Sequence, residues 1–191
     1  SVSVAVEYAY ITPDEINYIK SRPTDYEISQ VQLARTSIDA NLTQSQFRLN
    51  FTNPVKEMFF IVQTSDTTRI ENNLFDYSNA DDPMGEHIES VELSFNGEVR
   101  LSNTIATSAS LRYIQPMSHH TRTPTRRVHS YSFALKPELL QPSGTCNFSR
   151  IDNITAVPTM KNVNNTSMQM FATNYNVLRI MQGMGGLAFA D

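Results

Sequence analysis

The chain has 191 residues, of which 15 are basic and 19 acidic, and its net charge of −4 argues against a general nucleic-acid binder, which normally has a strong basic excess. Apolar residues make up 40% and charged residues 18%, which excludes a disordered chain, and the single cysteine, Cys146, excludes a disulfide framework. No stretch approaches 18 consecutive apolar residues, so the sequence predicts no membrane span. The length predicts a single domain over residues 1–191, with two smaller domains as the alternative.

The first segment alternates between apolar and polar residues and therefore predicts a β-strand. One face of this strand would carry Val2, Val4, Val6, Tyr8 and Tyr10. Because the alternation begins with the first residues, we expect the chain to be part of a longer polypeptide.

A short helix is predicted over residues 12–23, inserted between two strands. Thr12 is a suitable N-cap, Pro13 fits the first helical position, and Glu15 is placed to complete a capping box. Pro23 would end the helix, because proline cannot donate a backbone hydrogen bond.

The strand that follows changes its phase. Tyr26 and Ile28 share one parity, whereas Val31 and Leu33 have the other. A bulge near Ser29-Gln30 would let both pairs face the core. The alternative is a strand that crosses from one sheet to the other.

Further strands are predicted wherever apolar residues alternate or form short runs: 47–51, 55–63, 91–95, 99–101, 131–135 and 168–181. The segment 55–63 is almost continuously apolar, which is typical of a strand buried on both faces. Asn96-Gly97 tolerates the positive φ angles of a type I′ turn and predicts a hairpin. Residues 183–191 hold three of the six glycines and predict a flexible or tightly turned glycine-rich tail. Together these signals predict an all-β fold, an eight-stranded jelly-roll sandwich with one or two short inserted helices.

The charges are separated along the chain. Residues 71–98 contain eight acids and no base, whereas residues 99–137 contain six bases and no acid. One interpretation is that the two segments neutralise each other within one fold. The other is that they lie on different edges of a subunit and meet the opposite charge of a neighbour.

No residue pattern predicts catalysis. His119 and His120 are adjacent and point in different directions on either a helix or a strand, so one metal ion cannot easily bind both. His129 has no second ligand nearby in the sequence, and the flanks of Cys146 contain no known nucleophile motif. We therefore predict no enzyme activity, no catalytic, cofactor-binding or metal-binding residue, and no cofactor.

Four segments, in the same order along the chain, resemble the major capsid proteins of nucleocytoplasmic large DNA viruses, the chlorella-virus, mimivirus and iridovirus type. The resemblance is carried by NPVKEMFFIVQ (53–63), IQPMSHHTRTP (114–124), YSFALKPELLQPSGTCNFSRIDN (131–153) and YNVLRIMQGMGGLAF (175–189). Together these segments cover about 60 residues and span most of the chain. Four long matches in order are far more specific than any one alone.

This resemblance implies a structural protein and the second, C-terminal roll of a double jelly roll. Such proteins self-assemble as trimeric, pseudo-hexagonal capsomers of an icosahedral capsid, so the implied partners are two further copies, neighbouring capsomers and minor capsid proteins, with no direct nucleic-acid contact. The implied location is the virion, assembled in the host cytoplasm. The alternative that the residues leave open is a carbohydrate- or receptor-binding β-sandwich module.

Overall fold

The computed structural model describes residues 2–64, 75–79, 82, 85–161 and 164–189. Their contacts define two compact units, the larger being Ser29–Tyr175 and the smaller combining Ser1–Ile28 with Asn176–Asp191. The single domain over residues 1–191 with a tail over 183–191 stays a prediction. Among the helices in the described ranges, none has the length and apolar character needed to cross a membrane.

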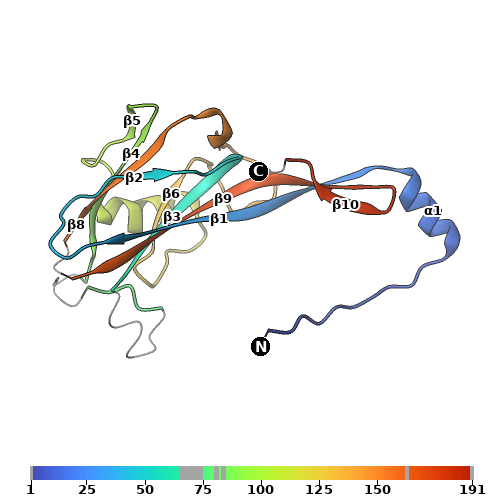
Figure 1. Cartoon of the computed structure of the whole chain (residues 1–191), viewed down its shortest axis with the longest axis horizontal. Helices are drawn as coiled ribbons and strands as arrows, with labels where there is room; N and C mark the ends of the chain where they lie inside the picture. The colour runs from blue at the N-terminus through green and yellow to red at the C-terminus, as the bar shows by residue number, and fades with distance from the viewer. Residues whose placement is uncertain (1, 65–74, 80–81, 83–84, 162–163, 190–191) are drawn as a thin grey trace. The chain divides into compact units, whose positions relative to one another are not determined.

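The fold consists of two antiparallel sheets, each built on four strands (Figure 1). The first has the order β1-β9-β3-β6: β1 (Thr24–Ile38), β9 (Thr166–Met181), β3 (Pro54–Thr64) and β6 (His129–Ser132). The second has the order β2-β8-β4-β5: β2 (Phe47–Leu49), β8 (Ile154–Met160), β4 (Ile88–Phe95) and β5 (Glu98–Leu101). This arrangement confirms the predicted all-β jelly roll.

Three strands were not predicted, β8 and two short ones, and with the predicted opening strand absent the described residues contain ten strands. β7 (Cys146–Asn147) pairs with β3, and β10 (Met184–Leu187) pairs with β9. β7 has only two residues and β10 contains two glycines, so neither has a visible alternation in the sequence. The helices are α1 (Pro13–Ser21), the π-helix η1 (Ser110–Ile114), α3 (Gln115–His119) and the 3-10 helix η2 (Phe148–Arg150).

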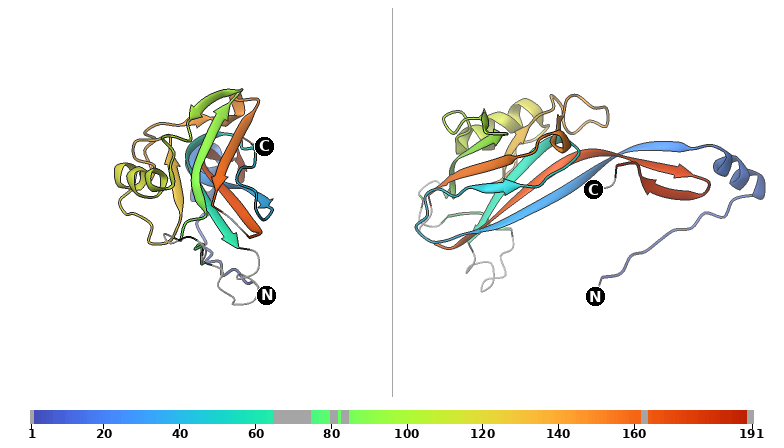
Figure 2. Two further views of the ribbon diagram at one scale, coloured as in Figure 1. Left: turned by 90° about the vertical axis from the view of Figure 1, so that its left-hand side faces the viewer. Right: turned by 45° about the horizontal axis from the view of Figure 1, so that its top comes forward.

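The core of the larger unit lies between the two sheets. Its largest fully buried side chains include Phe60 on β3, Leu93 on β4 and Phe148 on η2. η1 and α3 pack on the outer side of the first sheet, where α3 contacts β6 (Figure 2). β3 is therefore covered on both faces, as its apolar sequence predicted.

The local signals of α1 and of the β4–β5 hairpin are confirmed. Thr12 caps α1 in a capping box with Glu15, and Pro13 stands at the first helical position. Asn96 and Gly97 have φ angles of 51° and 87°, as a type I′ turn requires.

The predicted opening strand is wrong. No residue of 2–11 lies in a strand, and the apolar side chains of Val2 and Tyr10 are almost fully exposed. A period-two pattern favours a strand, but a strand forms only where a neighbour supplies hydrogen bonds. The segment has no such neighbour among the described residues.

The predicted bulge near Ser29-Gln30 is also wrong. β1 keeps one parity throughout its buried face, so Val31 and Leu33 point outward and are 64% and 45% exposed. Register shifts occur at other places in the sheets, among them one in β3 between Val55 and Glu57, which makes Lys56 the extra residue.

Gly144 has a backbone angle that other residues rarely adopt, and its surroundings leave little space. Its φ is +136°, and an added Cβ would lie 3.0 Å from the carbonyl oxygen of Phe133. We expect Gly144→Val to lower the free energy of unfolding by about 2–3 kcal/mol, measured by urea denaturation. Gly186→Val is the matched control, because an added Cβ there meets nothing within 4 Å. Equal stability of the two variants would contradict the conclusion that the backbone at residue 144 requires glycine.

Candidate functional site: a polar cluster where the motif segments meet

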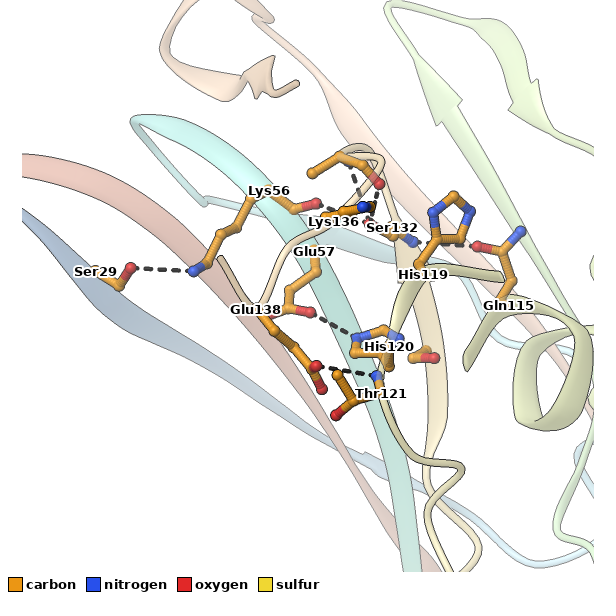
Figure 3. Close-up of polar contacts among 12 residues, drawn as sticks. Ser29, Lys56, Glu57, Gln115, His119, His120, Thr121, Ser132, Lys136 and Glu138 are labelled. Carbon is orange, nitrogen blue, oxygen red and sulfur yellow. Dashed lines mark hydrogen bonds and ion pairs between the residues drawn. The ribbon is translucent and has the colours of Figure 1, made fainter. Parts of the chain in front are cut away.

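Three of the four resembling segments meet on the outer face of β3. We call this group the motif cluster, and Figure 3 shows its side chains; its members are Lys56, Glu57, Gln115, His119, His120, Thr121, Ser132 and Glu138. The bulge at Lys56 explains how β3 takes part. A bulge changes the direction of the side chains beside it. Lys56 and Glu57 therefore both reach polar partners, although they lie within an otherwise apolar strand.

Glu57 and His120 form the centre of the motif cluster. The Nε2 of His120 lies 2.9 Å from the Oε2 of Glu57, and the two side chains are only 9% and 10% exposed. The ring of His120 also lies 6.1 Å from that of Phe59. Because a buried carboxylate is costly unless it is hydrogen-bonded, this contact fixes the loop that carries His120 to the sheet.

Lys56 joins three parts of the larger unit. Its ammonium group donates to the hydroxyl of Ser29, 3.1 Å away, and lies 5.1 Å from the centre of the Tyr175 ring. Its carbonyl oxygen accepts hydrogen bonds from the backbone N–H groups of Phe133 and Ala134. Both N–H groups bond to the same oxygen, so the regular pairing of β6 stops there. The predicted strand 131–135 therefore ends at Ser132.

The remaining contacts tie the loops after α3 and β6 together. The N–H of Thr121 donates to the Glu138 carboxylate at 2.9 Å, and the Nδ1 of His119 lies 3.1 Å from the carbonyl oxygen of Leu135. Hydrogen bonds from Thr121 hold the pKa of Glu138 below its ordinary value. The backbone N–H of Ser132 donates to the Gln115 side chain.

The cluster borders a depression of about 290 Å³ lined by residues 118–121, Lys136, Glu138 and Leu139. His119 and His120 point to different partners, as their adjacency predicted. In the described part of the chain, no three or more His, Cys, Asp and Glu side chains are arranged to hold a metal ion. The geometry therefore fits a structural tie between loops and sheet.

A second group of charges is buried beside η1. The guanidinium of Arg112 pairs with Glu86, and Nε2 of His129 lies 2.8 Å from the hydroxyl of Ser108 and 3.5 Å from Glu86. The side chains of Glu86, Arg112 and His129 are 9%, 12% and 3% exposed. Arg112 lies in a π-helical turn, a feature common at functional positions.

This group shows that the acidic and basic segments of the sequence neutralise each other in part within one chain. Glu86 belongs to the acidic segment 71–98 and Arg112 to the basic segment 99–137, so the two segments neutralise each other here within one chain. Hydrogen bonds from Ser78 lower the pKa of Asp76, with a smaller contribution from Arg127 and Arg126. The other interpretation, contact with a neighbour, stays a proposal for the exposed charges.

Burial lowers the pKa of His129 to about 4, an effect that Glu86 opposes and Arg112 and His87 reinforce. Because the unfolded histidine titrates near 6.5, the unfolded state binds more protons between these values. We expect stability to be intact above pH 6.5 and to fall by about 3 kcal/mol as the pH drops to 4.

The pH effect is measured by urea denaturation of the native chain and His129→Gln between pH 7.5 and 4. Other acidic groups contribute equally to both proteins, so the difference between the two curves isolates His129. Parallel curves would contradict the assignment.

Cys146 is half-buried in β7, and burial raises the pKa of its thiol. A raised pKa depletes the thiolate, which is the opposite of what a nucleophile needs. Cys146 therefore lies where its thiol contributes to packing.

Sequence reasoning missed both polar groups as spatial units. The sequence did contain an indication of the motif cluster, because Lys56-Glu57 is a charged pair within a segment predicted to be buried on both faces. The second had no signal, because Glu86, Arg112 and His129 come from separate segments with no motif spacing.

The structure thus defines a jelly-roll protein in which three of the four motif segments hold loops and sheet together through hydrogen bonds. A family model described as large eukaryotic DNA virus major capsid protein matches residues 15–186. This chain belongs to that family, as the resemblance predicted. The alternative of a carbohydrate- or receptor-binding module is not favoured.

Individual relatives and solved structures support the same family. The major capsid protein of Pyramimonas orientalis virus is 35% identical over an alignment covering 100% of this chain and 49% of the relative. A quasi-atomic model of the PBCV-1 virus capsid superimposes with a TM-score of 0.78 at 27% identity, covering 95% of this chain and 55% of that one. The Faustovirus major capsid protein, at 15% identity, shares the fold with a TM-score of 0.70 over 90% of this chain and 36% of its own. The chain spans about half the length of the curated relatives it matches.

Proposed function

We propose that this chain is the C-terminal jelly roll of a major capsid protein and builds an icosahedral shell as trimeric, pseudo-hexagonal capsomers. The observation that carries this proposal is the correspondence with the PBCV-1 capsid structure over 95% of the chain. The function is structural: the chain performs no reaction and serves by fitting against copies of itself and against neighbouring capsomers and minor capsid proteins. Its place is the virion, and assembly takes place in the host cytoplasm.

The motif cluster supports this function physically. A shell subunit must present the same surface in every copy, so its loops need fixed positions. The Glu57–His120 contact binds the loop after α3 to the sheet, and the Thr121–Glu138 contact binds that loop to the one after β6, without any need for a ligand. The exposed charges on these loops, such as Lys136, remain available to a neighbour.

The experiment is the mass of the protein in solution, measured by light scattering at low and high salt, followed by electron microscopy. We expect three copies per particle, threefold-symmetric images, and weaker association at high salt wherever exposed charges contribute. A monomer at every concentration and salt level would overturn the proposal.

A further inference from the structure

The helical segment on the outer side of the first sheet is held in place mainly by polar contacts at its two ends. We call residues 108–120 the outer segment; it contains η1 and α3 (Figure 2). Within it, only Leu111 and Pro116 are buried, whereas Ile114 and Met117 are exposed. A helix shorter than about 12–15 residues is marginal by itself in water. The outer segment therefore depends on its end contacts, and the two ends differ in chemistry.

The N-terminal end is fastened through a buried histidine. The Nε2 of His129, on β6, lies 2.8 Å from the hydroxyl of Ser108, the first residue of the outer segment. One turn further along, the guanidinium of Arg112 pairs with the carboxylate of Glu86. The same carboxylate lies 3.5 Å from the ring of His129. The contacts of this end thus meet in one buried group.

The charges of this group balance only while the ring of His129 is neutral. Burial opposes a proton on the ring and lowers its pKa, and the positive charges of Arg112 and His87 lower it further. The carboxylate of Glu86 and the backbone of Phe60 on β3 act in the opposite direction. Because Glu86 and Arg112 already cancel each other, a proton on His129 adds a buried charge that has no partner of its own.

Solvent lies directly beside the N-terminal end. An open depression of about 290 Å³ is lined by residues 107–109, Tyr113, Glu86, Glu89 and Lys161. Its wall therefore includes two residues that contact His129, namely Glu86 and Ser108. Glu89 and Lys161 carry opposite charges, so together they add no net charge at the edge of the group. A small displacement of this end would bring water to the ring of His129.

The C-terminal end is fastened by two carboxylates (Figure 3). Glu57 lies 2.9 Å from Nε2 of His120, and Glu138 accepts a hydrogen bond of 2.9 Å from the N–H of Thr121. A proton on His120 makes its contact with Glu57 a charge-assisted hydrogen bond, which is stronger. Hydrogen bonds from Thr121 hold the pKa of Glu138 below its ordinary value, so this carboxylate is ionised at pH 5. Weak acid therefore leaves this end attached.

We propose that the outer segment is an acid-released flap: protonation of His129 frees its N-terminal end from β6, while the contacts of His120 and Thr121 keep its C-terminal end in place as a hinge. The chain then has a closed form near neutral pH and an open form in weak acid, in which Leu111 is uncovered. Protonation of a histidine that biases a two-state element is a known way in which pH alters a protein surface. The proposal is independent of the capsid function, because it uses contacts within one chain.

Amide hydrogen exchange of the 191-residue chain, followed residue by residue by NMR, tests the flap. The N–H of Leu111 donates to the carbonyl oxygen of Thr107 at 3.0 Å and reports on the N-terminal end, whereas the N–H of Thr121 reports on the hinge. After correction for intrinsic exchange, we expect Leu111 to open roughly 30-fold more at pH 5 than at pH 7.5. The reason is that the ring titrates near 6.5 when exposed and at about 4 when buried.

Two further amides make the result decisive. Thr121 should show no such acid effect, and Phe60, within β3, should stay better protected than Leu111 at both pH values. An unchanged Leu111 would overturn the proposal. An equal acid effect at Thr121 would also overturn it, because the whole segment would then leave the sheet. Equal protection at Leu111 and Phe60 would overturn it as well, because the whole chain would then unfold.

His129→Gln removes the titrating ring and should abolish the acid effect at Leu111. His119→Gln is the matched control, because it removes another histidine of the outer segment, one whose Nδ1 lies 3.1 Å from the carbonyl oxygen of Leu135. This control should keep the full acid effect. Persistence of the effect in His129→Gln, or its loss in His119→Gln, would contradict the assignment to His129.

Arg112→Met tests the charge balance while His129 is retained. The substitution leaves the carboxylate of Glu86 without its guanidinium, so a proton on the ring then supplies the missing positive charge. We expect the acid effect at Leu111 to be lost or to reverse in this variant. An acid effect as large as that of the native chain would show that the balance of these charges does not control the flap.

Discussion

Phe148→Ala is expected to lower the free energy of unfolding by about 3–5 kcal/mol, because it removes a ring from the centre of the core. Phe148 is 1% exposed, and its ring centre lies 5.6 Å from those of both Phe95 and Phe133 and 6.5 Å from that of Phe51. The rings come from several elements, so their backbones cannot collapse together to fill the cavity.

Urea denaturation measures the effect of Phe148→Ala. Leu140→Ala removes a large apolar side chain that is 91% exposed and should change stability by less than about 0.5 kcal/mol. A loss of under about 1 kcal/mol for Phe148→Ala would mean that the aromatic cluster does not hold the two sheets together.

Glu86→Ala is expected to cost a similar amount, about 3–5 kcal/mol, for an electrostatic reason. The substitution leaves the guanidinium of Arg112 buried without its carboxylate, and an uncompensated buried charge is strongly destabilising. The loss should be measurable at pH 7.5, where His129 is neutral in both folded and unfolded chains.

Asp25→Ala is the matched control for Glu86→Ala. Asp25 and Arg179 also form an ion pair, but their side chains are 46% and 53% exposed, so water screens the attraction. We expect this variant to lose at most about 1 kcal/mol. If both variants lose the same stability, burial is not what makes the Glu86–Arg112 pair important.

The elements predicted most accurately from the sequence are those with local causes. Thr12, Pro13 and Glu15 determine where α1 begins, and Asn96-Gly97 determines the β4–β5 turn. These signals act within a few residues, through caps and φ angles, and do not depend on what packs against them. The resemblance of four ordered segments likewise identified the fold and the family.

The failures involve neighbours that are distant in the sequence. Residues 2–11 and Val31 have patterns that predict burial, but burial requires a second surface, and none of the described residues supplies one. The bulge in β3 occurs at Lys56, whose carbonyl oxygen accepts hydrogen bonds from the distant residues Phe133 and Ala134. Alternation along a strand carries no information about such a partner.

The amino-acid sequence by itself determined the jelly-roll class, the capsid family, and the start and stop signals of α1 and the β4–β5 hairpin, because periodicity, caps and turns are properties of neighbouring residues. Only the tertiary structure decided that Glu57 pairs with His120 and Glu86 with Arg112. Buried charges must find partners wherever the fold brings them together, and that meeting depends on the packing of whole sheets and loops.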